Sequence, residues 1–169
     1  AQASRAAASL RETLRGLAPA HAAEGLAALI GVDVSCFSES TGLPADLAVI
    51  GPPTALSAQQ EAALLALVRE GLHNVARHAG ASSVLVTLHH GPESTDVLVQ
   101  DDGRGLPDDL VPCDLPRDGR HYGLASLRLR LLRAGGEMAL VGNQDGGTTL
   151  RGSILHHHDG GAEPRAHRG

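Results

Sequence analysis

The hydrophobic positions along the chain recur with two different periods, which predict helices and strands in turn. Residues 1–18 carry leucines at helical spacing and predict a helix. The segment Ala20–Ile30 predicts a second, short helix that ends at Gly31. The run Val32–Phe37 alternates apolar and polar residues, as a half-buried strand does, and a further short strand is expected at Leu47–Ile50.

The clearest predicted element is a helix from Ser57 to Ala79. Ser57 is a suitable N-cap, and Gln60 follows three residues later, as in a capping box. At about 100° per residue, one face carries the apolar residues Leu65, Val68, Leu72 and Val75. The opposite face carries Glu70, Asn74 and Arg77. Gly80 is expected to end the helix.

The second half of the chain predicts two strand pairs separated by a loop and a helix. The alternating runs Ser83–His89 and Thr95–Gln100 predict an antiparallel pair. A long loop (101–120) follows, and then a helix and two strands are expected at Leu124–Ala134, Glu137–Val141 and Thr148–Leu155. This order favours an α+β protein, a two-layer α/β sandwich with a mixed, mostly antiparallel sheet and helices on one face.

Composition narrows the classes of function. The only aromatic residues are Phe37 and Tyr122, which argues against a stacking platform for RNA or single-stranded DNA. The chain has 14 basic residues, all Arg, and 19 acidic ones, so it lacks the basic surface of a nucleic-acid-binding protein. No apolar run reaches the roughly 18 to 20 residues of a membrane span. Two separated cysteines, Cys36 and Cys113, favour a reducing, cytoplasmic compartment without disulfides or zinc.

Several histidines fall outside the main motifs. Adjacent residues of a strand point to opposite faces, so His89 and His90 are not expected to bind one metal ion. His73 is expected on the helix surface, and the run 156–158 is expected to open a disordered tail.

The polar helix face at Glu70, Asn74 and Arg77, with His78 beside it, is the first candidate for chemistry. An amide or carboxylate oxygen suits Mg²⁺, which prefers oxygen ligands and keeps most of its waters. A guanidinium such as that of Arg77 can bind phosphate by paired hydrogen bonds. A solvated helix face with pairs three and four residues apart explains the same pattern and is favoured on these residues alone.

The second candidate is the segment 101–105 (DDGRG), which follows a predicted strand. Glycines at this place let the backbone turn sharply or approach a ligand, and a carboxylate there can accept a hydrogen bond from the amino group of adenine. An acidic turn is the alternative. The segment is not a dinucleotide-binding fingerprint, because Asp108 stands where the third glycine should be.

Two further segments contain glycines at element boundaries. Gly123 and Leu124 open the helix after the long loop, and free N–H groups at a helix N-terminus bind anions. The segment 146–150 (GGTTL) enters the last strand. A plain helix start and a hairpin turn are the simpler interpretations of these segments taken singly.

Together these segments resemble the ATP-binding domain of bacterial sensor histidine kinases, within the gyrase/Hsp90/histidine kinase/MutL (GHKL, Bergerat-type) ATPase superfamily. The segment 70–79 (EGLHNVARHA) is similar to the N box of the subfamily that pairs with LuxR/NarL-type response regulators. The segment 101–105 resembles the first glycine box, and 123–136 resembles the second with its helix. The segment 147–150 (GTTL) resembles the last box, so the resemblance covers about 45–155.

The resemblance implies a role for each matching residue. On the phosphate side, Asn74 would coordinate Mg²⁺, Glu70 would lie beside the attacking group or its metal, and Arg77 and His78 would lie near the phosphates. On the base side, Asp101 would hold the adenine amino group, Gly103 and Gly105 would lie beside the base, and Thr148 would close the base pocket. Gly123 and Leu124 would also lie at the phosphates.

One departure from the family concerns the lid over the phosphates, which the resemblance places just before Gly123. The family usually has a glycine two positions earlier, where this chain has His121. The hinge of the lid is therefore expected to be stiffer or to lie elsewhere, for example at Gly119.

The resemblance implies an ATP·Mg²⁺-binding catalytic domain that transfers the γ-phosphoryl group to a His on a dimerisation helix outside this chain. We expect 1–18 to be the tail of that helix, 19–155 the catalytic domain and 156–169 a disordered tail. The chain does not begin with Met and is expected to be a monomeric piece of a homodimeric kinase without membrane contact of its own. The alternatives are an anti-sigma-type serine kinase and a degenerate ATP-sensing or dimerisation module without phosphotransfer.

Overall fold

The computed structural model describes residues 25–106 and 122–156, which form one sheet and a layer of helices. The helices are α2 (Leu26–Thr41), α3 (Ala58–Asn74), its π-helical continuation η1 (Val75–Ala79) and α4 (Tyr122–Arg133). The strands are β1 (Ala45–Ile50), β2 (Val84–His90), β3 (Ser94–Asp101), β4 (Gly136–Gly142) and β5 (Thr148–Leu155).

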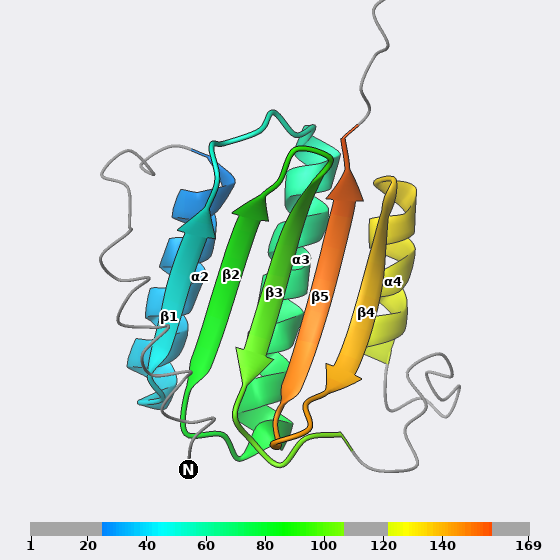
Figure 1. The fold of residues 1–169 in the computed structure, drawn as a ribbon. Coiled ribbons are helices and arrows are strands. Elements are labelled where there is room, and N and C mark those ends of the chain that lie inside the picture. The colour runs from blue at the N-terminus through cyan, green and yellow to red at the C-terminus, as the bar shows by residue number, and fades with distance from the viewer. Residues whose placement is uncertain (1–24, 107–121, 157–169) are drawn as a thin grey trace, which may run out of the picture.

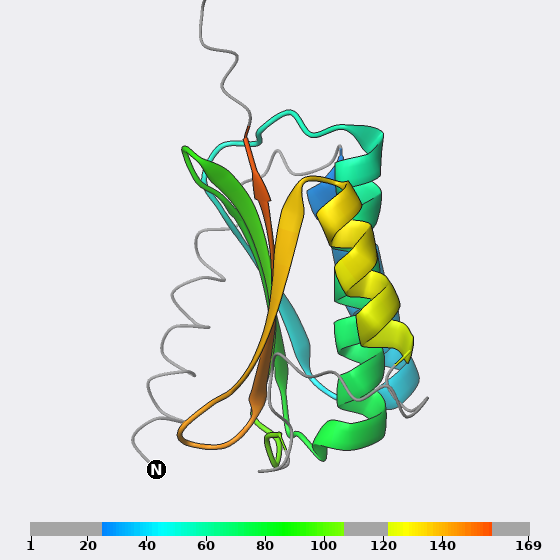
Figure 2. The same ribbon diagram turned by 90° about the vertical axis from the view of Figure 1, so that its right-hand side faces the viewer.

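The sheet has five strands in the order β1-β2-β3-β5-β4 (Figure 1). β1 runs parallel to β2, and the other neighbouring pairs are antiparallel. Figure 2 shows the sheet from its edge, with α2, α3 and α4 all on one face. The predicted two-layer α+β sandwich with a mixed, mostly antiparallel sheet is therefore confirmed.

The hydrophobic core lies between the sheet and the helices. On β2, buried and half-buried residues alternate, and Val84, Val86 and Leu88 are completely buried. Each such side chain contributes about 1.5–3 kcal/mol relative to an exposed one. The central helix α3 lies very close to the sheet, because a Cβ on Gly71 would be only 2.9 Å from Cβ of Val99. This contact fixes the second half of α3 against the carboxyl end of β3.

The strand predicted at Val32–Phe37 is wrong, because these residues belong to α2. The buried residues of this helix are Leu26, Ile30, Val34 and Phe37, a spacing that follows the helical period. Over six residues an alternating pattern also fits part of this stripe, so the short window misled the interpretation. Gly31 does not end the helix, which continues until Gly42 adopts a left-handed φ of 72°.

The predicted helix from Ser57 is confirmed, including its capping box. The N–H of Gln60 donates to Oγ of Ser57 at 3.3 Å, and the N–H of Ser57 donates to Oε1 of Gln60 at 2.9 Å. The sequence does not predict that the last turn, Val75–Ala79, widens into a π-helix. Such turns are uncommon and are often found at functional sites.

The remaining predicted elements are found close to their expected places, namely the β2–β3 hairpin, α4 and the strands β1, β4 and β5. The predicted helix at 1–18, most of the loop 101–120 and the tail beyond His156 lie outside the described residues. Among the helices that the structure describes, none is both long and apolar enough to cross a membrane.

Candidate functional site

The sequence-predicted site residues come together at one end of the sheet. This end holds the carboxyl end of β3, the beginning of β5, the last turns of α3 with η1, and the beginning of α4 (Figure 1). The antiparallel register pairs Asp101 with Val84 and Gln100 with Thr149. The topology thus gathers four segments that are far apart in the sequence.

Asp101 is the buried acid of this end of the sheet, with 9% of its surface exposed. Its carboxylate accepts a hydrogen bond from the N–H of Gly103 at 2.9 Å and another from the backbone of Thr148. Burial raises the pKa of Asp101, and the two backbone donors oppose this rise. The side chain is therefore held in one orientation, at the place where the resemblance puts the adenine amino group.

The glycines around Asp101 bring three backbone segments so close that a side chain would not fit. A Cβ on Gly103 would overlap the carbonyl oxygen of Ala79. A Cβ on Gly147, whose φ is 87°, would overlap the carbonyl oxygen of Asp101. Gly105, with a φ of 78°, lies beside the carbonyl of Gly147. These contacts join the ends of η1, β3 and the β4–β5 turn beside Asp101.

Asp102 is a residue of this site that sequence reasoning missed. Its Oδ1 accepts the backbone N–H groups of Ser82 and Ser83 at 2.8 and 2.9 Å. Its Oδ2 accepts the hydroxyl groups of the same two serines at 2.7 and 2.8 Å. These hydrogen bonds lower the pKa of Asp102 to about 2, although partial burial opposes the shift. The register that pairs Asp101 with Val84 places Asp102 beside Ser83, and the sequence alone does not fix this register.

The phosphate-side residues Glu70 and Asn74 lie together, and α4 begins beside them. Nδ2 of Asn74 is 3.5 Å from Oε1 of Glu70, four residues earlier on the same helix. A Cβ on Gly123 would overlap this same Oε1, so the first turn of α4 lies directly against the Glu70 carboxylate. The contact joins the segments that resemble the N box and the second glycine box.

The side-chain oxygens of Glu70 and Asn74 are suitable ligands for Mg²⁺. Asn74 uses its NH₂ group toward Glu70, and no described residue donates a hydrogen bond to its amide oxygen. A carboxylate and a neutral amide oxygen are ligands that Mg²⁺ accepts together with phosphate oxygens and water. Asn74, with Glu70 beside it, is therefore able to hold the ion that the resemblance implies.

Three other predicted residues are placed differently from these. Arg77 and His78 lie on the π-helical turn η1, are exposed, and form no hydrogen bond or ion pair with the described residues. Leu124 is 6% exposed and belongs to the core, so only its backbone can reach a ligand. Thr148 begins β5, beside Asp101.

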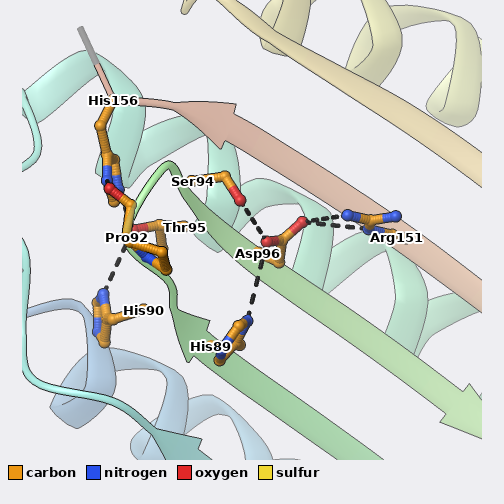
Figure 3. A network of polar contacts seen from close by, with 8 residues as sticks. All are labelled: His89, His90, Pro92, Ser94, Thr95, Asp96, Arg151 and His156. Carbon is orange, nitrogen blue, oxygen red and sulfur yellow. Dashed lines mark hydrogen bonds and ion pairs between the residues drawn. The ribbon is translucent and has the colours of Figure 1, made fainter. Parts of the chain in front are cut away.

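A separate polar network lies at the opposite end of the sheet, around the β2–β3 hairpin (Figure 3). Oδ1 of Asp96 accepts from Nη2 of Arg151 at 2.6 Å, and Nδ1 of His89 is 4.0 Å from Oδ2 of Asp96. His90 contacts the hydroxyl of Thr95 on the other face of the sheet, as expected for adjacent strand residues. Within the described residues, no three His, Cys, Asp or Glu side chains are grouped to hold a metal ion.

Comparison with known proteins agrees with the fold and the motifs. Residues 59–157 match the model of the family "Histidine kinase-, DNA gyrase B-, and HSP90-like ATPase". The chain belongs to this family, and its fold and motifs are those of the ATPase domain found in sensor histidine kinases.

Among individual proteins, the nitrate/nitrite sensor protein NarX of Escherichia coli is 30% identical over 121 residues, which are 70% of this chain and 19% of NarX. The nitrate/nitrite sensor protein NarQ of the same organism is 35% identical over 59% of this chain and 17% of NarQ. The chain thus spans about a fifth of the length of these relatives. The histidine kinase domain of the blue-light activated kinase EL346 of Erythrobacter litoralis has a TM-score of 0.59 at 27% identity, covering 76% of this chain and 64% of that one.

Proposed function

We propose that this chain is the catalytic domain of a two-component sensor histidine kinase and transfers the γ-phosphoryl group of ATP to a His on a dimerisation helix. The observation that carries the proposal is the buried Asp101 carboxylate, which lies among glycines whose positions leave no room for a side chain. A second polar centre, formed by Glu70 and Asn74, lies against the beginning of α4. The two centres supply the base-side and phosphate-side contacts that ATP requires.

At the base side, Asp101 accepts the amino group of adenine. The backbone N–H of Gly103 already donates to Oδ1 of Asp101 and fixes the direction in which the carboxylate points. Gly103 and Gly105 keep the neighbouring wall free of side chains, and Thr148 closes it from β5. Guanine has an acceptor in place of the amino group, so this arrangement favours ATP over GTP.

At the phosphate side, Asn74 ligates Mg²⁺ through its amide oxygen. The ion supplies charge neutralisation for the phosphate oxygens when it is bound. Glu70, next to Asn74, would lie beside the attacking group or its metal. Arg77 and His78, exposed on η1, would lie near the phosphates. The first turn of α4, at Gly123 and the backbone of Leu124, offers N–H groups to the same phosphates.

The wider organisation follows from the same family. The catalytic domain corresponds to 19–155, and 1–18 belong to the dimerisation segment that precedes it. His156, expected to open the tail, is instead held to the β2–β3 hairpin, where its N–H donates to the carbonyl oxygen of Glu93 at 2.8 Å. The parent kinase is a homodimer that phosphorylates a LuxR/NarL-type response regulator, and this domain works in the cytoplasm as a monomer, without contact to nucleic acid or membrane. The relatives NarX and NarQ, both named as nitrate/nitrite sensor proteins, support this class of kinase.

Calorimetric titration with ATP and GTP, with and without Mg²⁺, tests nucleotide binding directly. We expect ATP to bind more tightly than GTP and Asp101→Asn to lose most of the ATP affinity. Asp33→Asn is the matched control, since Asp33, on α2, forms a surface ion pair with Arg69 of α3. Equal binding of ATP by the wild type and by Asp101→Asn would remove Asp101 from the site.

Phosphotransfer is tested after a phosphoacceptor helix is added upstream of residue 1. Acid-labile label on His of that helix is the expected product. Acid-stable label on Ser would indicate an anti-sigma-type serine kinase instead. ATP binding without any label would indicate an ATP-sensing module.

A further inference from the structure

Beyond the residues that the proposed function uses, Asp102 connects the two chain segments that border the base side of the site. We propose that Asp102 is a positioning residue for nucleotide binding, because its Oδ1 holds the backbone of Ser82 and Ser83 and thereby places the end of η1 against Gly103. This inference rests on the proposed function and extends it to a residue that does not itself touch the nucleotide.

The two carboxylate oxygens of Asp102 accept hydrogen bonds from different kinds of donor. Oδ1 accepts two backbone N–H groups, from Ser82 and Ser83, at 2.8 and 2.9 Å. Oδ2 accepts the two serine hydroxyl groups at 2.7 and 2.8 Å. The backbone pair fixes the course of the chain, whereas the hydroxyl pair fixes only side chains that could turn to water.

The segment that carries Ser82 and Ser83 is held to the segment after Asp101 at a second point as well. Ser82 and Ser83 lie two and three residues after Gly80, where η1 ends with a φ of 59°. On the other side of the contact, the N–H of Arg104 donates to the carbonyl oxygen of Ala79 at 2.9 Å. A Cβ on Gly103 would overlap this same carbonyl. The segment 79–83 is therefore held to 102–104 from both ends.

Gly103 connects this pair of segments to the carboxylate of Asp101. Gly103 provides the N–H that orients the Asp101 carboxylate. Any shift of the segment 102–104 would move that N–H and change the direction of the carboxylate toward the base. Asp102 thus acts on the nucleotide through Gly103 and Asp101, and it acts on the base rather than on the phosphates.

The hydrogen bonds of Asp102 to the backbone can be separated from its charge. A carboxylate so close to Asp101 raises the pKa of Asp101, which works against an ionised adenine acceptor. An Asn at position 102 would keep an oxygen for the two backbone N–H groups and would remove this charge. The backbone pair and the charge can therefore be separated by Asp102→Asn and Asp102→Ala.

The test measures affinities of the complete 169-residue chain for ATP and for inorganic tripolyphosphate, which has no base, by calorimetry. For Asp102→Ala we expect ATP affinity to fall on the order of tenfold or more, because two charge-assisted hydrogen bonds are lost. Tripolyphosphate affinity should change less than about twofold. Asp102→Asn and the double variant Ser82→Ala/Ser83→Ala should retain ATP affinity close to that of the wild type.

Hydrogen exchange gives a readout that is independent of nucleotide. In Asp102→Ala, the amides of Ser82, Ser83 and Arg104 should exchange faster, and in Asp102→Asn they should stay protected. If Asp102→Ala does not fold, Asp102→Glu replaces it, since one added methylene displaces the carboxylate from the two N–H groups.

The outcomes separate the two proposals. Wild-type chain that binds no ATP contradicts the proposed function, and exchange alone then decides the role of Asp102. Unchanged protection of Arg104 in Asp102→Ala, or equal losses for ATP and tripolyphosphate, would overturn the positioning role. A loss in Asp102→Asn as large as in Asp102→Ala would overturn the assignment to the Oδ1 backbone pair.

Discussion

Gly123, at the beginning of α4, lies directly against the carboxylate of Glu70 near the end of the adjacent helix α3. A Cβ at position 123 would overlap Oε1 of Glu70 and lie 2.6 Å from its Cδ. The same Oε1 is the oxygen nearest to Nδ2 of Asn74. The position of α4 and the orientation of the Glu70 carboxylate are therefore coupled through a glycine.

Gly123→Ala should therefore displace the Glu70 carboxylate and separate it from Asn74. Because the added methyl group acts on the phosphate side, the phosphotransfer rate should fall on the order of tenfold to a hundredfold, while ATP affinity changes little. Single-turnover phosphorylation of an added phosphoacceptor helix measures the rate, and calorimetry measures the affinity. Ala125→Ser, at an exposed position two residues further on α4, is the control. A Gly123→Ala variant with the wild-type rate would contradict the coupling.

Asn74→Ala should weaken the dependence of ATP binding on Mg²⁺. The variant loses the amide oxygen that is available for the ion, so the gain in ATP affinity on adding Mg²⁺ should shrink on the order of tenfold, about 1.4 kcal/mol. Titrations with ATP in Mg²⁺ and in chelator measure this gain. His73→Ala, next to it on the exposed side of the helix, should leave the gain unchanged. If Asn74→Ala kept the full gain, another residue would hold the ion.

Gly31→Ala should stabilise the fold. Gly31 lies inside α2 and not at its end, and its Cβ would meet only Cδ2 of Leu47, at an ordinary distance of 3.8 Å. Alanine in a helix interior is more favourable than glycine by about 0.5–1 kcal/mol, so the free energy of unfolding in urea should rise by that amount. Gly71→Ala, where the Cβ would be 2.9 Å from Val99, should instead destabilise the chain. A lower free energy of unfolding for Gly31→Ala would show that this part of α2 is not a regular helix.

Asp102 should make the stability of the chain sensitive to acid. Its pKa is lowered to about 2 in the folded chain, so its ionised form favours folding. This contribution is fully present above about pH 4 and is lost as the pH falls through the folded-state value of about 2. The difference in free energy of unfolding between wild type and Asp102→Asn should thus be constant above about pH 4 and shrink at lower pH.

Urea unfolding between pH 7 and the most acidic pH at which the wild type still folds measures this difference. The double variant Ser82→Ala/Ser83→Ala keeps the carboxylate but removes the hydroxyl donors. The acid sensitivity of its stability should therefore lie between that of the wild type and that of Asp102→Asn. A difference between wild type and Asp102→Asn that does not change with pH would contradict the role of the ionised carboxylate.

Much of the fold could be predicted from periodicity, because most elements are long enough to show one period clearly. The helix from Ser57 has both a capping box and an apolar stripe over several turns, and buried and half-buried residues alternate along β2. The exception is Val32–Phe37, where six residues cannot distinguish alternation from a helical stripe. Reading the stripe from Leu26 through Phe37 as a whole would have given the helix.

The candidate site was harder to predict from the residues themselves. Glu70 and Gly123 are 53 positions apart, and no spacing rule connects them, so their association rested on the family resemblance. The π-helical turn had no sequence signal, and it leaves Arg77 and His78 exposed without described partners. Asp102 lies beside Ser83 through a strand register that the sequence alone does not fix.

Because the hairpin network and Asp101 lie at opposite ends of the sheet, a fluorescent group at the hairpin could measure the distance to a bound nucleotide. The two ends of β3, Ser94 and Asp101, are seven residue steps apart, about 23 Å along the strand. The chain has no tryptophan, so an indole introduced at the exposed Glu93 would be its sole emitter of that kind. Energy transfer from it to a fluorescent ATP analogue would then report, across the length of one strand, how close to Asp101 the nucleotide lies.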